Sequence, residues 1–239
     1  MSLKYNRLHL FNIRFLLEEL KGYVDYMESY IEQSIKDFDR KYDVASVDAL
    51  KETDTEYYDY LCETLSEKWL QVNKTFPHNF RASFLTQIYS GFESQLVKIC
   101  KHHHIRKKTA KPYEKYKGSE IGKASEYLIA MAGIDFADLQ DDFDYIDQIR
   151  LVRNHIVHNQ GKIAGNDRDW PIVYNFVKAN KAKVVFNHDP EEPDDDGLPL
   201  HIGRPEFKFS FLIIDRQLND ELIVVVDRFF KKLLENEIS

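Results

Sequence analysis

Residues 151–161 contain an arginine, an asparagine and a histidine on an otherwise mostly apolar stretch: Arg153, Asn154 and His158. RNA supplies its own nucleophile, the ribose 2′-hydroxyl, so a protein that cleaves it must move protons and stabilise charge on the phosphate. An imidazole exchanges protons near neutral pH, and a guanidinium presents a fork of donors that matches phosphate oxygens. The three residue types therefore predict a site that binds and cleaves a phosphodiester without a metal.

The spacing of these residues suits one end of a helix. Asn154 and His158 are four residues apart and share a helical face. Arg153 is displaced by about 100° from Asn154 around the axis, but its long side chain can curl toward that face. His158 lies in the last turn, where unpaired carbonyls favour a positive charge. The three groups are therefore expected to converge on one phosphate.

A purely structural role for the same residues stays open at this level. His158 can cap the carbonyls of its own helix, and Arg153 can pair with a nearby acid. The first turns of the predicted helix hold several acids and no basic residue: Asp135, Asp138, Asp141, Asp142, Asp144 and Asp147. Acids near a helix N-terminus complement the macrodipole, so most of this run needs no functional reason.

Residues 153–161 read Arg-Asn-His-Ile-Val-His-Asn-Gln-Gly. This segment resembles the Arg-Asn-x-(Ile/Val)-Val-His-Asn-x-Gly form of the motif of the HEPN family (higher eukaryotes and prokaryotes nucleotide-binding). Residues 80–84 and 88–96 resemble the helix that precedes the motif in that family, with a serine and a glutamate in an apolar setting. The similarity covers roughly residues 79–161.

The resemblance implies an all-α bundle, dimerisation through the motif helix and metal-independent endoribonuclease activity. By the same resemblance, Arg153 and His158 are the catalytic pair, and Asn154 is the polar residue that follows the arginine and positions the substrate. Glu93 is expected to support the site through a salt bridge that orients Arg153. His155, beside the catalytic face, is expected to contact the dimer partner.

A two-fold dimer also follows from the chemistry, because one His158 per chain is awkward for paired acid and base roles. Two copies of the helix face to face would place Arg153 and His158 from both subunits in one cleft. Relatives often serve in toxin–antitoxin or phage-defence systems, which adds an antitoxin or another protein as an expected partner. Some HEPN proteins keep the fold and lose the activity. A non-catalytic scaffold that binds nucleotides or RNA, or only dimerises, is therefore the alternative.

The most basic part of the chain is residues 101–117, with seven basic residues and one acid. Tyr113 and Tyr116 lie in the same segment, and basic and aromatic residues together suit single-stranded RNA. A solvated loop is the competing interpretation. The residues that we expect to contact RNA are Arg106, Lys107, Lys108, Lys111 and Lys162.

No metal or cofactor is expected. Residues 102–104 are three consecutive histidines, which point in different directions on a helix and seldom bind one metal together. The chain has neither a Walker loop nor a dinucleotide-binding glycine pattern. Cys62 and Cys100 are expected to be buried free thiols rather than a disulfide.

Apolar spacings of three and four residues predict helices, and two runs rich in β-branched and aromatic residues predict strands. The helices are expected at about residues 8–40, 54–73, 79–103, 119–131, 135–159 and 219–234, with a break at Pro77 and an N-cap at Asn79. The strands are expected near 183–186 and 207–214. The acidic, proline-containing stretch between them is expected to be a solvated hairpin tip.

The predicted fold class is mainly α: a HEPN-like up-and-down bundle with a long N-terminal helical hairpin and a small C-terminal β-hairpin. We expect residues 1–75 to form the hairpin, packed on the bundle or extending it. Residues 76–239 would form the HEPN-like domain, with the β-hairpin inserted at about 182–214.

Composition excludes some classes of protein. The formal net charge of −7 over 239 residues argues against a general polyanion binder, so contact with nucleic acid requires a local basic patch. No apolar run approaches the roughly 20 residues that a membrane span needs. The N-terminus lacks a secretory pattern, and the expected location is the cytoplasm.

Overall fold

The computed structural model describes residues 3–42, 51, 53–187 and 210–236. The chain is mainly helical and carries a small three-stranded antiparallel sheet, which confirms the coarse fold class predicted from the sequence. The α-helices are α1 (Leu3–Lys41), α3 (Thr55–Leu70), α4 (Phe76–Lys107), α5 (Glu120–Tyr127), α6 (Gln140–Asn159), α7 (Trp170–Ala179) and α9 (Arg216–Asn236). The strands are β1 (Lys162–Ile163), β2 (Val184–Phe186) and β3 (Ser210–Ile214). No helix in the described ranges has the apolar length that crossing a bilayer requires.

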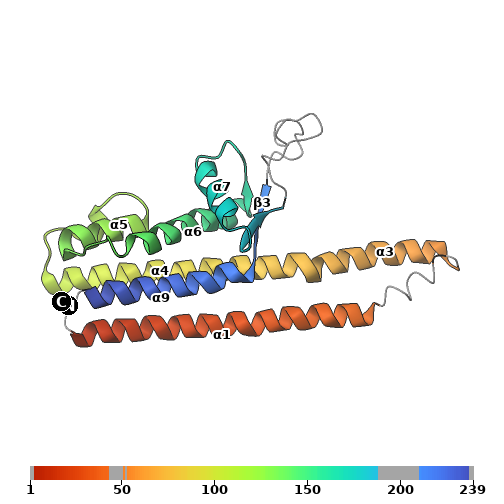
Figure 1. The fold of residues 1–239 in the computed structure, drawn as a ribbon, viewed down its shortest axis with the longest axis horizontal. Helices are drawn as coiled ribbons and strands as arrows, with labels where there is room; N and C mark the ends of the chain where they lie inside the picture. The colour runs from red at the N-terminus through yellow and green to blue at the C-terminus, as the bar shows by residue number, and fades with distance from the viewer. Residues whose placement is uncertain (1–2, 43–50, 52, 188–209, 237–239) are drawn as a thin grey trace.

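Three long helices form the body of the molecule. α1, α4 and α9 lie side by side, while α5 and α6 cover the opposite side of α4 (Figure 1). Most of the buried core comes from these helices, and α1 contributes Ile13, Leu17, Val24 and Ile31. α1 therefore packs along the bundle over much of its length. α3 extends beyond the bundle and buries none of its side chains.

The expected break at Pro77 is wrong, and so is the expected N-cap at Asn79. α3 continues into α4 through η1 (Gln71–Thr75), a π-helical segment. Proline has no N–H to donate and its ring crowds the carbonyl four residues back, so a regular α-turn is disfavoured there. The Phe76 N–H instead bonds to the Gln71 carbonyl, five residues back. A wider turn accommodates the proline, and the helix does not end.

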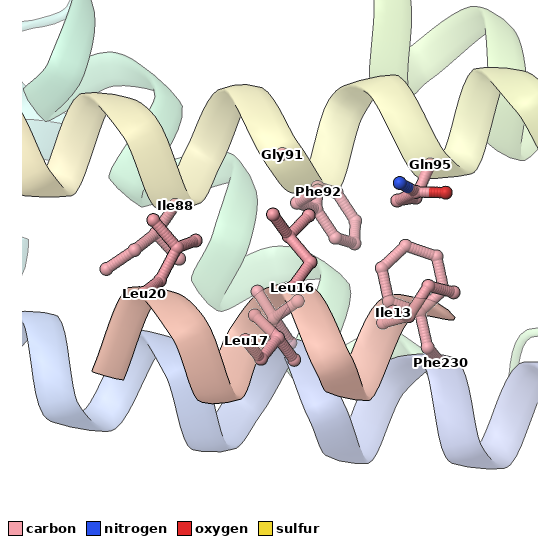
Figure 2. Close-up of a pocket in the computed structure, with 10 residues that line it drawn as sticks. Ile13, Leu16, Leu17, Leu20, Ile88, Gly91, Phe92, Gln95 and Phe230 are labelled. Atoms are coloured by element: carbon pink, nitrogen blue, oxygen red, sulfur yellow. The ribbon is translucent and has the colours of Figure 1, made fainter. Parts of the chain in front are cut away.

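The junction of α1, α4 and α9 is closely packed. Figure 2 shows Leu20 of α1 beside Ile88 of α4, and Leu16 of α1 beside Phe92 of α4. A Cβ atom on Gly91 would lie 3.4 Å from Leu16 Cδ2, so the glycine lets the two helices approach closely here. The space among these side chains is apolar and has no room for a water molecule. This part of the molecule serves packing and not ligand binding.

The smaller elements cover the motif helix. α6 begins at Gln140, several residues later than expected. α7 was not predicted, although Trp170, Val173 and Phe176 have helical spacing, and it packs on α6 with ring centroids of Tyr145 and Phe176 5.8 Å apart. The predicted pairing of the two strands is confirmed: β2 pairs with β3 antiparallel, and β1 adds a third strand on the other side of β3. The acidic stretch expected to be the hairpin tip lies outside the described residues.

Asp142 anchors the start of α6 to α9. Its carboxylate is buried and accepts hydrogen bonds from Arg228 Nε at 2.8 Å and Lys232 Nζ at 2.9 Å. Burial opposes ionisation of Asp142, but the hydrogen bonds from Arg228 and Lys232 outweigh it and hold the pKa of this carboxyl below its ordinary value. The ionised form of Asp142 therefore stabilises the fold.

Asp142→Asn is expected to lower the free energy of unfolding by about 1–2 kcal/mol at neutral pH, since Arg228 and Lys232 stay partly solvated. A carboxyl whose pKa is lowered by folding stabilises the protein above its unfolded pKa, and that contribution is lost as the pH falls through the folded value. Urea unfolding should therefore show the difference from the parent narrowing below about pH 4. The exposed neighbour Asp141→Asn is the control and should change little; equal losses in both variants would contradict the anchor.

Candidate active site

The end of α6 is closed by a left-handed cap. Gln160 has a φ of 55° and Gly161 a φ of 78°, and the Gly161 N–H donates to the His155 carbonyl at 2.9 Å. The Gln160 N–H bonds to the same carbonyl, so two consecutive N–H groups after the last helical residue satisfy one carbonyl and the helix ends here, which confirms the predicted stop at Gly161. The Gly161 carbonyl then accepts from the Leu212 N–H at 3.0 Å. The last turn of α6 is thus connected directly to β3.

Arg153 lies half-buried over the ring of Tyr89, with its guanidinium carbon 5.7 Å from the ring centroid. Its Nη1 donates to Asn154 Oδ1 at 3.1 Å, so the side chain curls toward Asn154 as expected. Its Nε is buried and has no hydrogen-bond partner among the described residues. No carboxylate of the described residues forms an ion pair with the Arg153 guanidinium. Arg153 is thus a positioned cation with an unused donor.

Arg150, one turn earlier on the same helix, has the opposite status. Its Nε donates to Asp147 Oδ1 at 2.7 Å and its Nη2 to Asp147 Oδ2 at 3.2 Å. Hydrogen bonding to Asp147 raises the pKa of Arg150. The pairing of an arginine with a nearby aspartate, which the sequence left open for Arg153, is therefore made by Arg150.

The two histidines of the motif divide in the same way. His158 is exposed and makes no hydrogen bond to any residue that the structure describes. His155 is only 6% exposed, and its Nδ1 donates to the Lys162 carbonyl at 3.1 Å. His158 thus caps no described carbonyl of its own helix, and His155 instead ties α6 to the start of β1. The ring of His155 is buried within its own protomer, which leaves little of it exposed for the expected contact with a dimer partner.

Glu93 supports the site by a different route from the one predicted. Glu93 Oε2 accepts a hydrogen bond from the Tyr89 hydroxyl at 3.2 Å, and the expected salt bridge with Arg153 is not formed. Burial, together with the nearby charge of Glu93, raises the pKa of Tyr89. Tyr89 therefore links Glu93 to Arg153: its hydroxyl is fixed on one side and its ring carries the guanidinium. Sequence reasoning missed Tyr89, because an aromatic residue on the apolar face of a helix is indistinguishable from ordinary core.

The predicted RNA-contacting residues do not gather in one place. Arg106 and Lys107 end α4, 17 or more residues beyond Tyr89, which is about 25 Å along a helix. Lys108 forms the left-handed cap of α4, and Lys111 Nζ lies 3.6 Å from the ring centroid of Tyr116. The basic segment is thus remote from Arg153 within one protomer. Lys162 is different, since it begins β1 directly after α6.

The three consecutive histidines point to different neighbours. His102 Nδ1 lies 3.2 Å from His9 Nε2, and His103 Nδ1 lies 2.9 Å from the Tyr127 hydroxyl. His104 Nδ1 lies 2.6 Å from Thr109 Oγ1. These contacts hold the N-terminal part of α1 and the loop after α4 against the C-terminal end of α4.

Comparison of the chain with protein-family models, curated proteins and solved structures finds no match. The interpretation of the site therefore depends on its own geometry and on the motif. The geometry distinguishes the two arginines and the two histidines of this part of α6. Arg150 and His155 form an ion pair and a buried hydrogen bond that stabilise the structure. Arg153 forms no ion pair and His158 no hydrogen bond with any described residue.

This difference predicts that replacing His155 destabilises the protein, whereas replacing His158 leaves its stability almost unchanged. His155→Ala removes a buried ring and its hydrogen bond to the Lys162 carbonyl, and should lower the free energy of unfolding by about 1–3 kcal/mol. His158→Ala removes an exposed ring without a partner and should change it by less than about 0.5 kcal/mol. Urea denaturation of both variants beside the parent measures the difference. A larger loss for His158→Ala would show that these roles are reversed.

Proposed function

We propose that this protein is a homodimeric, metal-independent endoribonuclease of the HEPN type. The observation that supports this most directly is that, among the described residues, Arg153 forms no ion pair and has an unpartnered Nε, and His158 makes no hydrogen bond. The neighbouring residues of the same types, Arg150 and His155, are bonded to Asp147 and to the Lys162 carbonyl. A positioned cation with an unsatisfied buried donor is costly to maintain unless a ligand completes it. A phosphate oxygen is the ligand that best fits a guanidinium fork.

The chemistry assigns one role to each side chain. Arg153, whose guanidinium lies over the ring of Tyr89, holds the scissile phosphate and stabilises the charge that develops on the phosphate oxygens. The side-chain oxygen Oδ1 of Asn154 accepts a hydrogen bond from the Arg153 guanidinium, and the side-chain NH2 group of Asn154 is available to position the substrate. His158, exposed at the end of α6, exchanges protons with the reacting oxygens.

The reaction needs no metal. The 2′-hydroxyl loses its proton to a base as its oxygen attacks the phosphorus. The bond to the 5′-oxygen breaks, and that oxygen takes up a proton. The products are a 2′,3′-cyclic phosphate and a 5′-hydroxyl. Because one His158 cannot conveniently serve as base and acid in a single concerted step, the proposal includes a second copy of the chain that contributes its own His158 to the cleft.

Cleavage of mixed RNA in EDTA is the direct test. The parent should cleave, while Arg153→Ala and His158→Ala should each lose about 100-fold or more in rate, because each removes a group that acts in the transition state. Arg153→Lys keeps the charge but not the fork, and should recover only part of the activity. The ends of the products are read by mass spectrometry.

Arg150→Gln is the matched control, since it removes an arginine from the same helix that is already paired with Asp147. It should keep most of the activity. Equal losses for Arg150→Gln and Arg153→Ala would indicate a general electrostatic effect. No cleavage by the folded parent under any condition would favour a non-catalytic scaffold that binds nucleotides or RNA.

A shared cleft that needs both copies of His158 predicts that one His158→Ala subunit inactivates its whole dimer. After the parent is mixed with an equal amount of His158→Ala and re-equilibrated, random exchange leaves about a quarter of the dimers with two parental subunits. The activity should then be about a quarter of that of the same total amount of parent protein. An activity near one half, the share of parental subunits in the mixture, would place each complete site within one subunit.

A further inference from the structure

The small sheet next to the end of α6 has one covered and one exposed face. Along β3 the side chains alternate: Ser210, Leu212 and Ile214 are buried, whereas Phe211 and Ile213 are 39% and 40% exposed. Val185 of β2 pairs with Ile213 and is exposed on the same face. An aromatic ring thus lies open to solvent beside the helix that carries the motif.

Lys162 places a positive charge beside that ring. It is the direct cross-strand partner of Phe211, and its Nζ lies 5.7 Å from the centroid of the Phe211 ring. Side chains on paired residues of neighbouring strands share a face. None of the strand residues described on this face is acidic. Lys162 follows His158 by four residues, which limits the distance between their Cα atoms to about 14 Å.

The backbone holds this pair in a fixed relation to the motif. The Lys162 carbonyl accepts from the buried ring of His155 at 3.1 Å. The Phe211 N–H donates to Asn187 Oδ1 at 2.7 Å, and the Phe211 carbonyl accepts from the Asn187 N–H at 2.9 Å. The exposed ring and the ammonium group are therefore carried on backbone that is tied on both sides.

We infer that Phe211 and Lys162 form a subsite for an unpaired nucleotide next to the scissile phosphate, in which the base stacks on Phe211 and Lys162 contacts a phosphate. An exposed aromatic face with a neighbouring cation matches a planar base on an anionic backbone. A base can stack on a protein ring only when it has left its own duplex, so the subsite selects single-stranded RNA. The inference rests on the proposed function, which supplies the RNA substrate.

Binding is tested in the His158→Ala background, so that no cleavage interferes. Fluorescence anisotropy compares a short labelled single strand with a duplex of the same sequence. Phe211→Leu should weaken binding of the single strand about ten-fold, because the ring is lost while an apolar side chain remains, and should leave duplex binding unchanged. Ile213→Leu is the matched control on the same strand and face, and should change neither. Equal affinities for the parent background and Phe211→Leu would overturn the subsite.

A second measurement reports stacking directly. In Phe211→Trp, the fluorescence of the added indole should be quenched by single-stranded RNA, whereas Ile213→Trp should respond weakly. Equal quenching at both positions would contradict a specific stacking role for residue 211. Lys162→Gln should weaken binding and reduce its salt dependence by about one phosphate contact. An unchanged salt dependence would remove Lys162 from the subsite.

These outcomes separate the subsite from the proposed function. If Phe211→Leu loses binding while Arg153→Ala still cleaves, the subsite stands and the assignment of the catalytic pair fails. If Arg153→Ala abolishes cleavage while Phe211→Leu binds like its parent, the subsite alone fails. Sedimentation of parent and Phe211→Leu tests the other occupant of this face. A dimeric parent and a monomeric variant would make the face an interface between copies, which overturns the subsite.

Discussion

The hydrogen bond from the buried ring of His155 to the Lys162 carbonyl fixes the end of α6 against the sheet. The left-handed turn at Gln160 and Gly161 reverses the chain so that this bond can form, and β3 then pairs with the chain just after it. Because both ends of the turn are held, the last turn of α6 cannot fray freely. His158 therefore keeps an exposed but defined place, and Lys162 and Phe211 stand at a fixed distance from it.

A second constraint on α6 comes from α4, through the contact between Tyr89 and Arg153. Tyr89 comes from the middle of α4 and is fully buried, so the surrounding core holds its ring in place. Its hydroxyl bonds to Glu93, and its ring carries Arg153. The guanidinium is thus positioned by the core and not by a carboxylate. A direct ion pair with Glu93 would neutralise Arg153 and compete with phosphate, whereas an aromatic support positions the charge and leaves its donors available.

Periodicity was sufficient to predict α1, α4, α6, α9 and the pairing of β2 with β3, because each of these elements buries an apolar face. It also predicted α3, although α3 buries no side chain. Periodicity failed where one residue type is compatible with two local structures or with two roles. Pro77 commonly ends a helix, but here a π-helical segment absorbs it and the helix continues. Tyr89 has the spacing of a core residue, and it is one; its second task depends on where α6 crosses α4. Asp147 lies three residues before Arg150 and six before Arg153, so helical spacing alone favours its pairing with Arg150. The contact of Arg153 with Tyr89 joins two different helices, and the sequence does not give it. α7 was missed although Pro171 at its first turn and its apolar spacing predict a helix.

Under the proposed function, the continuous helix of α3, η1 and α4 would determine how RNA uses the basic segment. Arg106 and Lys107 lie about 25 Å from Tyr89 along this rod. One RNA strand can contact both places only if it runs lengthwise along the bundle, or if the second subunit of a dimer brings its own basic segment toward the cleft. The net charge of −7 favours contacts confined to such patches, since the rest of the surface repels the strand. Under the proposed function, positive charge far from the motif would act in capture and alignment, and the end of α6 would discriminate between paired and unpaired RNA.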